Sequence, residues 1–268
     1  MNIRLLGQAV LQLLGLKFAT VKYRNKDINC YVPKVEYALP FDGEWYAANG
    51  GVTKNTSHSW EVLPQRFAYD FIIVDEEGES YRGDKKDLCS YYCYGKDILA
   101  PADGVVVSIK NNFPDCRIMS DGKTDPDTPD IGGNRIIIKH SSNEYSAICH
   151  LMPGSVMVQK GQTVKRGDAI AKCGNSGNTS EPHVHFQVQN TAHFYSCIGL
   201  PIPFSNIQKR LYAKYNMVDT RPLPEEDIND GYIHRGLLVK NFGNETYEDF
   251  STLILRNVNK KQVISAQS

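Results

Sequence analysis

The chain has 268 residues, enough for one large domain or one and a half, and its 41% hydrophobic and 22% charged residues are an ordinary globular composition. Its 30 basic and 30 acidic side chains cancel, so the net charge gives no support for a nucleic-acid or anionic-membrane partner. No apolar run approaches the ~20 residues that a transmembrane segment requires.

The N-terminal segment is the first predicted element. Residues 1–19 carry leucines and a valine that are interrupted by Gly7, Gln8, Gln12 and Gly15, and no A-x-A-like cleavage site follows. We predict an amphipathic helix that packs on the body of the protein, in preference to a degraded signal or anchor.

After residue 20, short β-type runs separated by glycine dominate the sequence. We predict strands at residues 68–74, 104–109, 135–140, 146–150 and 183–188. The breakers between them are equally clear, at residues 100–104 (APADG), 160–162 (KGQ), 166–168 (RGD) and 174–178 (GNSGN). Many short, closely spaced strands favour a mainly β protein, a sandwich or barrel, over a βαβ sheet.

Two segments differ from this pattern. Residues 111–133 are polar and rich in Asp, Pro and Gly, but they lack the residue order of a calcium loop, and we predict a solvated surface insertion. After Asn190 the residue pattern changes again, and a charged stretch is followed by a β-compatible tail. That tail either continues the same sheet or forms a small appended subdomain.

A histidine pair stands on the last predicted strand. Side chains at i and i+2 of a strand point to the same face, so His183 and His185 are expected to emerge together while Val184 and Phe186 face the other way. Two imidazoles beside a loop rich in Gly, Asn and Ser suit a metal or proton-transfer site. An isolated H-x-H is also compatible with a merely solvated strand face.

Two further residues strengthen the metal interpretation. Asp70 lies in an otherwise apolar strand, where a carboxylate requires a partner or a cation. His150 ends another apolar strand, and strand alternation is expected to direct it toward the metal face. One Asp and three His from three strands provide what a catalytic zinc needs, namely N and O ligands, an open position and a nearby base.

The order of these segments resembles a known family. Residues 174–188, GNSGNTSEPHVHFQV, are similar to the G-x-S-G…P-H-x-H-F signature of the lysostaphin-type (LytM-like) zinc metallopeptidases. The same family order is followed by residues 97–106 (DILAPADGVV), 133–140 (GNRIIIKH), 145–151 (YSAICHL) and 158–170 (VQKGQTVKRGDAI). The resemblance covers roughly residues 65 to 190.

The resemblance implies a fold, an activity and a location. The fold would be an antiparallel β-sheet groove of the barrel-sandwich hybrid type. The activity would be zinc-dependent endopeptidase cleavage of peptide bonds in bacterial peptidoglycan, which places the protein outside the cell or in its envelope. The chain then divides into an N-terminal helical extension (1–38), a metallopeptidase domain (39–200) and a C-terminal extension that packs on the core (201–268).

The same resemblance assigns residue roles. Asp70 and His185 would be zinc ligands, and His150 and His183 would be non-ligand histidines that move protons and stabilise the oxyanion. His140 would be structural.

One position departs from the family pattern. The family's first ligand is the His of H-x-x-x-D, and Arg66 stands there. An arginine cannot ligate zinc. Catalytic zinc normally has three protein ligands, so we predict that His58, twelve residues before Asp70, replaces the missing one. Arg66 would then be free to pair with a substrate carboxylate or a neighbouring acid.

Two other functions stay open at this point. The first is a catalytically silent homologue of the same fold that binds the cell wall or regulates another hydrolase, which the loss of the usual first ligand supports. The second is a phosphocarrier domain of a sugar uptake system, which shares half-barrel architecture and a pair of histidines but would have no need of Asp70.

Overall fold

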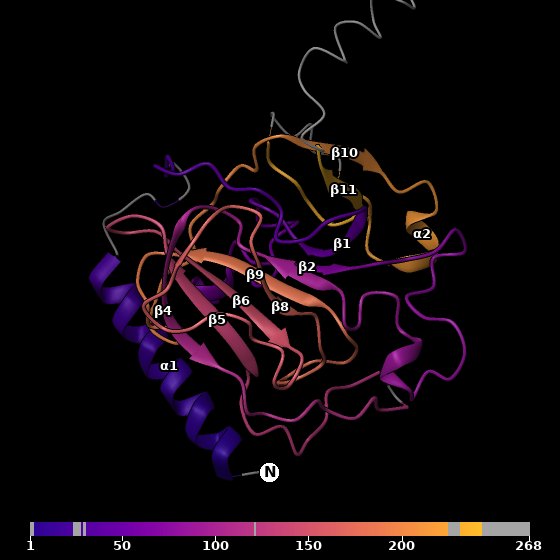
Figure 1. Cartoon of the computed structure of the whole chain (residues 1–268), viewed down its shortest axis with the longest axis horizontal. Coiled ribbons are helices and arrows are strands. Elements are labelled where there is room, and N and C mark those ends of the chain that lie inside the picture. The colour runs from indigo at the N-terminus through magenta and orange to yellow at the C-terminus, as the bar shows by residue number, and fades with distance from the viewer. Residues whose placement is uncertain (1–2, 24–27, 29–30, 121, 225–230, 243–268) are drawn as a thin grey trace, which may run out of the picture.

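The short apolar runs of the sequence form one large sheet (Figure 1). The structure is a computed structural model that describes residues 3–23, 28, 31–120, 122–224 and 231–242. The end of the predicted β-compatible tail lies outside the described residues.

In the part of the chain that the structure describes, the sheet has nine strands, and every neighbouring pair is antiparallel. In spatial order they are β10 (Ile207–Leu211), β11 (Leu237–Asn241), β1 (Trp45–Gly50), β2 (Tyr69–Ile72), β9 (Val184–Gln189), β6 (Tyr145–Leu151), β5 (Asn134–Lys139), β4 (Gly104–Lys110) and β7 (Thr163–Val164). The five predicted strands are β2, β4, β5, β6 and β9. The mainly β prediction is confirmed, and within the described residues the sheet is open, without barrel closure.

Smaller elements surround this sheet. A separate ribbon pairs β3 (Asp97–Leu99) with β8 (Ala169–Lys172). Two short 3₁₀ helices, η2 (Leu63–Gln65) and η3 (Leu88–Ser90), and one helical turn, α2 (Tyr215–Val218), lie in the connections.

The core lies against one face of the sheet. On β9, Val184 and Phe186 are completely buried in the main hydrophobic cluster, together with Ile148 of β6 and Phe71 of β2. The alternate residues of β9, beginning with His185, lie on the opposite face, as a side-chain period of two requires. This separation leaves one face of the central strands available for polar chemistry.

The predicted N-terminal helix is α1 (Ile3–Tyr23), which runs along one flank of the body (Figure 1). It contacts the body through two small residues and, near its end, through Tyr23, whose hydroxyl accepts from the Asn190 amide nitrogen at 2.6 Å. Ala19 is buried, and Gly15 lies so close to the backbone of Tyr195 that any side chain there would collide with it. Leu13 and Leu14 are exposed. Among the described residues, no helix has the length and apolar character needed to cross a membrane.

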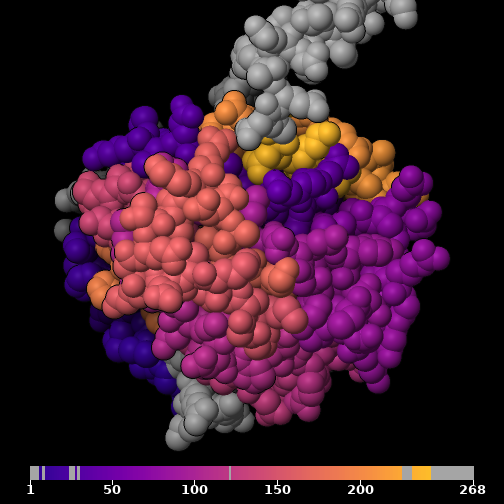
Figure 2. Space-filling model, in the orientation of Figure 1, coloured from indigo at the N-terminus to yellow at the C-terminus, as the bar shows by residue number. Residues whose placement is uncertain are grey.

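The described part of the C-terminal segment joins the same sheet. β11 pairs with β1 on one side and with β10 on the other, so β10 forms this edge of the sheet. Figure 2 shows the two regions touching at the surface, where the yellow atoms of the β11 region adjoin the indigo atoms of the β1 region. The three-part division of the chain stays a prediction.

Residues 111–133 are packed more tightly than the sequence predicts. Cys116 and Thr128 are buried, and both lie within hydrogen-bonding distance of the Gly177 carbonyl oxygen. Arg117 makes a two-point contact with the buried carboxylate of Asp125, with nitrogen to oxygen distances of 3.0 and 2.9 Å. The prediction of a solvated insertion is wrong for these residues, because the segment is anchored to the loop that precedes the H-x-H strand.

Candidate metal centre

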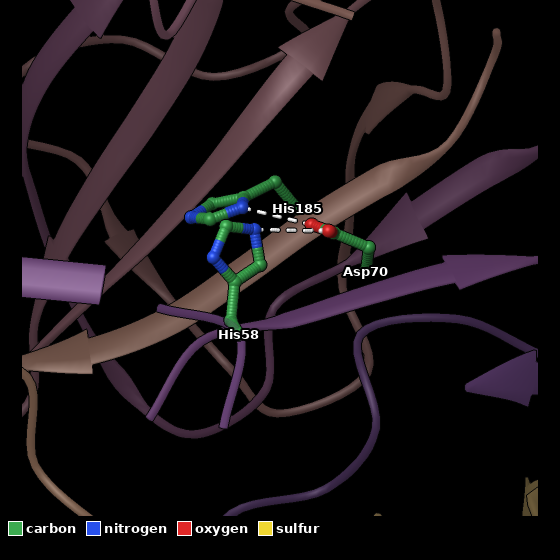
Figure 3. Close-up of side chains that lie close together, drawn as sticks. All are labelled: His58, Asp70 and His185. Atoms are coloured by element: carbon green, nitrogen blue, oxygen red, sulfur yellow. Dashed lines mark hydrogen bonds and ion pairs between the residues drawn. The ribbon is translucent and has the colours of Figure 1, made fainter. Parts of the chain in front are cut away.

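Three side chains meet on the polar face of the sheet (Figure 3). His58 Nε2 lies 3.0 Å from Asp70 Oδ2, and His185 Nδ1 lies 2.9 Å from Asp70 Oδ1. One ligand atom from each residue can be chosen so that all three lie within 4.8 Å of one another. The carboxylate therefore lies between two imidazoles that reach it from different elements.

The sheet register brings two of these residues together. Asp70 of β2 and His185 of β9 are directly paired across the antiparallel ladder, although 115 residues separate them in the sequence. Paired residues project to the same face, so the backbone hydrogen bonds fix both side chains on the site side. Their neighbours Phe71 and Phe186 project into the core.

His58 reaches the cluster from a loop rather than from a strand. It lies between β1 and η2, and its ring also contacts Ser59, with 3.0 Å between Nδ1 and Oγ. The loop begins with a turn in which the Ser57 amide donates to the Thr53 carbonyl oxygen at 2.8 Å. The structure thus places His58 beside Asp70, and its role as a ligand stays a prediction.

His183 stands just before β9, on the same side as His185. Its Nδ1 lies 2.8 Å from the Glu181 carbonyl oxygen, which only accepts hydrogen bonds, so Nδ1 carries the proton. Its Nε2 is left as an acceptor and lies 3.7 Å from Asp70 Oδ1.

His150 joins this group through an irregularity in β6. Cys149 pairs with His185, so strict alternation would send His150 to the core face. The predicted reason for its direction is therefore wrong. A bulge between β5 and β6, together with a φ of 62° at His150, reverses the side chain, as bulges near active sites commonly do.

The reversed His150 ring contacts the other histidines. Its centroid lies 4.6 Å from that of His183 and 5.8 Å from that of His185. Its Nδ1 lies 2.7 Å from the Ser176 carbonyl oxygen, which leaves Nε2 as an acceptor.

A chain of amides fixes the tautomer of His185. The Gln189 amide nitrogen donates to the Thr191 carbonyl oxygen at 2.7 Å, so its Oε1 faces Gln187 and accepts from the Gln187 amide nitrogen at 2.6 Å. Gln187 Oε1 must then accept from His185 Nε2, at 3.0 Å. The Nδ1 lone pair of His185 is therefore directed at the Asp70 carboxylate. A cation bound by both groups would stabilise this arrangement, in which two acceptor atoms face each other.

Burial and neighbouring charges shift the pKa values of Asp70, His58 and His150. Burial works to raise the pKa of Asp70, but the neighbouring histidines, His58 above all, outweigh it and hold that pKa well below its ordinary value. Burial works to lower the pKa of His58, and Asp70 outweighs it, so that pKa is raised. For His150, burial and then the two nearby imidazoles both lower the pKa, so this ring is neutral near pH 7.

The cluster opens into a cavity of about 240 Å³. One wall comes from Thr124, Ile131 and Gly132 of the 111–133 segment, so this segment shapes the cavity. Among the described residues that line it, Asp70 is the only carboxylate, and no lysine or arginine is present. Two imidazoles, one carboxylate and open space beside them match a catalytic zinc site with three protein ligands and one free position.

Comparison with known proteins identifies a family for the central part of the chain. Residues 90–196 match the model of peptidase family M23. The chain contains a peptidase family M23 domain. The predicted resemblance to lysostaphin-type metallopeptidases is thereby confirmed. The match to the M23 model includes His150, His183 and His185, whereas His58 and Asp70 precede it.

Relatives of the M23 domain include two curated bacterial proteins. The peptidoglycan DD-endopeptidase ShyA of Vibrio cholerae serotype O1 is 26% identical over 122 residues, which are 45% of this chain and 24% of that protein. The murein hydrolase activator NlpD of Salmonella dublin is 31% identical over 136 residues, which are 50% of this chain and 30% of that protein. The chain thus spans about a quarter of the first relative's length and less than a third of the second's.

Solved structures of similar proteins were also found. A zinc-containing peptidase from Vibrio cholerae is 21% identical, with 63% of this chain and 41% of that chain covered and a TM-score of 0.38. The catalytic domain of lysostaphin from Staphylococcus simulans is 17% identical, with 59% and 88% covered and a TM-score of 0.33.

The other residues considered in the sequence lie outside the group formed by Asp70 and the four site histidines. His140 bridges the Asp103 carbonyl oxygen and Ser146 Oγ, at 2.8 Å each, as a structural histidine would. The Arg66 guanidinium contacts Trp60 and lies in the field of the neighbouring acid Glu61, and its pairing with a substrate carboxylate stays a prediction. Gln187 and Gln189 were not among the predicted site residues, although their positions at i+2 and i+4 from His185 place them on the same strand face.

Proposed function

We propose that this protein is a zinc-dependent endopeptidase that hydrolyses peptide bonds in the cross-bridges or stem peptides of bacterial cell-wall peptidoglycan, and that it acts in the envelope or outside the cell. The observation that carries the proposal is the contact of His58 and His185 with opposite oxygens of Asp70. Membership of family M23 and the peptidoglycan endopeptidase among its relatives support the substrate class. We assign the catalytic unit to residues 39–200.

His58, Asp70 and His185 would hold the zinc. When bound, the zinc would polarise the scissile carbonyl and lower the pKa of a water molecule to about 7. His150 and His183 would have separate roles in the reaction.

His150 is suited to act as the general base. Its Nδ1–H donates to the Ser176 carbonyl oxygen, so Nε2 is the atom that accepts a proton from the attacking water and later delivers it to the leaving amine. Burial favours the neutral ring before the reaction.

His183 is suited to stabilise the oxyanion. Its ring lines the cavity, and its Nε2 lies 3.7 Å from Asp70 Oδ1, beside the proposed metal position. Protonated at Nε2, it donates a hydrogen bond to the negative oxygen of the tetrahedral intermediate.

The test combines metal analysis with digestion of purified peptidoglycan. We expect about one zinc per chain and release of new amino groups from peptidoglycan, with both lost in Asp70→Ala and retained in the control His193→Ala, because His193 is exposed and outside the cluster. Full zinc occupancy in Asp70→Ala would contradict the metal assignment.

A second candidate function is a silent homologue that binds the cell wall or regulates another hydrolase. The murein hydrolase activator among the relatives and the arginine at position 66 favour it. Zinc binding without any peptide-bond cleavage, combined with retention on peptidoglycan, would select this function over the first.

A further inference from the structure

Arg66 is directed toward the loop that carries His58. Its Nε donates to the Trp60 carbonyl oxygen at 2.7 Å, and its guanidinium carbon lies 4.6 Å from the centre of the Trp60 ring. Its backbone carbonyl oxygen accepts from Ser57 Oγ at 2.6 Å. The three contacts therefore hold the residues on both sides of His58.

The loop is in turn tied to the core. The Trp60 ring meets Phe67 edge to face, with 6.2 Å between centroids, and Phe67 is buried. Arg66 also ends η2 and stands four residues before Asp70. The arginine thus connects the loop bearing one proposed ligand to the strand bearing another.

His58 depends on such contacts because it lacks a strand ladder. Its ring contacts Asp70 and Ser59, and it meets the His185 ring edge to face with 5.2 Å between centroids, but none of these contacts fixes the backbone of the loop. A loop that is mobile before binding must be ordered when a metal binds, and this entropy loss weakens affinity unless the ligand is already in place.

We propose that Arg66 is a positioning residue for His58: it holds the 57–60 loop so that His58 Nε2 stays against Asp70. This inference rests on the proposed zinc site. The residue that takes the place of the family's first ligand thereby orients the side chain that substitutes for it. Arginine suits this role because its planar group can stack on an indole while Nε–H donates, which lysine cannot reproduce.

The first experiment measures zinc affinity of the metal-free full chain by competition with a chelator. Arg66→Ala should weaken binding by about 10–100-fold, the usual effect of losing a residue that orients a ligand. Arg66→Lys should rescue little, because charge alone does not restore the Nε contact. The matched control Arg210→Ala, which removes an exposed ion pair with Glu44, should bind zinc like the wild type.

A double-mutant cycle separates positioning from general destabilisation. If Arg66 acts through His58, Arg66→Ala should add nothing to the affinity loss of His58→Ala. Additive losses would overturn the proposal. Should Arg66→Ala unfold the chain, Arg66→Met keeps an unbranched stem to pack on Trp60, removes the Nε donor and gives the same test.

The second experiment needs no metal. Hydrogen exchange of the Ser57 and Val62 amides, which donate to Thr53 and Ser59 carbonyl oxygens, should accelerate in metal-free Arg66→Ala while β9 amides keep their protection. Unchanged exchange, or wild-type zinc affinity in Arg66→Ala beside a loss in His58→Ala, would overturn the Arg66 inference alone. Failure of the wild type to bind zinc would instead overturn the proposed function, and this role of Arg66 with it.

Discussion

The two halves of the proposed metal centre are held in place by different kinds of structure. Asp70 and His185 are partners across β2 and β9, so their positions follow from backbone hydrogen bonds in the middle of a nine-stranded sheet. His58 lies on a loop, and its position follows from side-chain contacts made by Ser57, Trp60 and Arg66.

This difference teaches where the site is robust and where it is fragile. Strand partners keep their relative position when a neighbouring side chain changes, because the ladder is made by the backbone. A loop ligand can lose its position through one substitution, because a few side-chain contacts replace the ladder. Substitutions in each half therefore test whether the contrast is real.

The largest effect is expected at Asp70, which lies in the strand half and contacts the histidine of each half. Asp70→Ala removes the oxygen ligand and leaves His58 and His185 without their common partner. We expect zinc binding to be lost, as for His185→Ala, with the fold retained in circular dichroism. Zinc content measured after dialysis checks this, and near-stoichiometric metal in either variant would contradict it.

The next effect concerns the two histidines that we do not count as ligands. His150→Ala and His183→Ala should each lower the rate of peptide-bond cleavage by about 10²–10⁴-fold, the usual scale for general acid–base groups. Both variants should keep their zinc. If either one loses the metal, that histidine belongs among the ligands and its assigned role is wrong.

A smaller effect is expected in the strand half, at Gln187. Gln187→Leu removes the acceptor for His185 Nε2–H, so the tautomer is no longer fixed and zinc affinity should fall by about 10–100-fold. Gln187→Glu keeps an acceptor and should retain most of the affinity. Chelator competition on both variants measures this, and equal affinities would show that the ladder alone positions His185.

The smallest effect is a pH dependence at the structural histidine. Burial lowers the pKa of His140 below 6.5 and outweighs the Asp103 carbonyl oxygen and the Glu144 charge. The folded state therefore binds this proton less readily than the unfolded chain. The stability that it provides is present above about pH 6.5 and is lost as the pH falls below that value toward the folded pKa.

Urea unfolding checks this sign. Between about pH 7.5 and about pH 5.5, the wild type should lose more free energy of unfolding than His140→Gln, which keeps polar contacts but does not titrate. An identical pH dependence in both proteins would show that His140 contributes nothing to it.

Local sequence pattern was sufficient for the central strands. Alternating or continuous apolar runs bounded by Gly and Pro predicted β2, β4, β5, β6 and β9, because side-chain periodicity is a property of the strand itself. The three strands at one end of the sheet, β10, β11 and β1, were not predicted as strands. Their pairing joins residues near 45 to residues near 240, and short-range periodicity carries no information about such distant partners.

The same division applies to the site. The sequence by itself determined that His183 and His185 point to the same side, because side chains alternate along an extended segment, and that Asp70 needs a partner, because burying a charge is costly. Only the tertiary structure decided that Asp70 pairs with His185 and that a bulge reverses His150.

Arg66 shows the limit of the sequence most clearly. Its chemistry excluded it as a ligand, but a free guanidinium and one packed on Trp60 look the same in a sequence. The placement of His58 against Asp70 and of Arg66 against the His58 loop depends on the fold of residues 51–66, which is set by contacts with β2 and the core. Local residue chemistry was therefore sufficient to predict candidate site residues, and long-range packing decided which of them lie in contact.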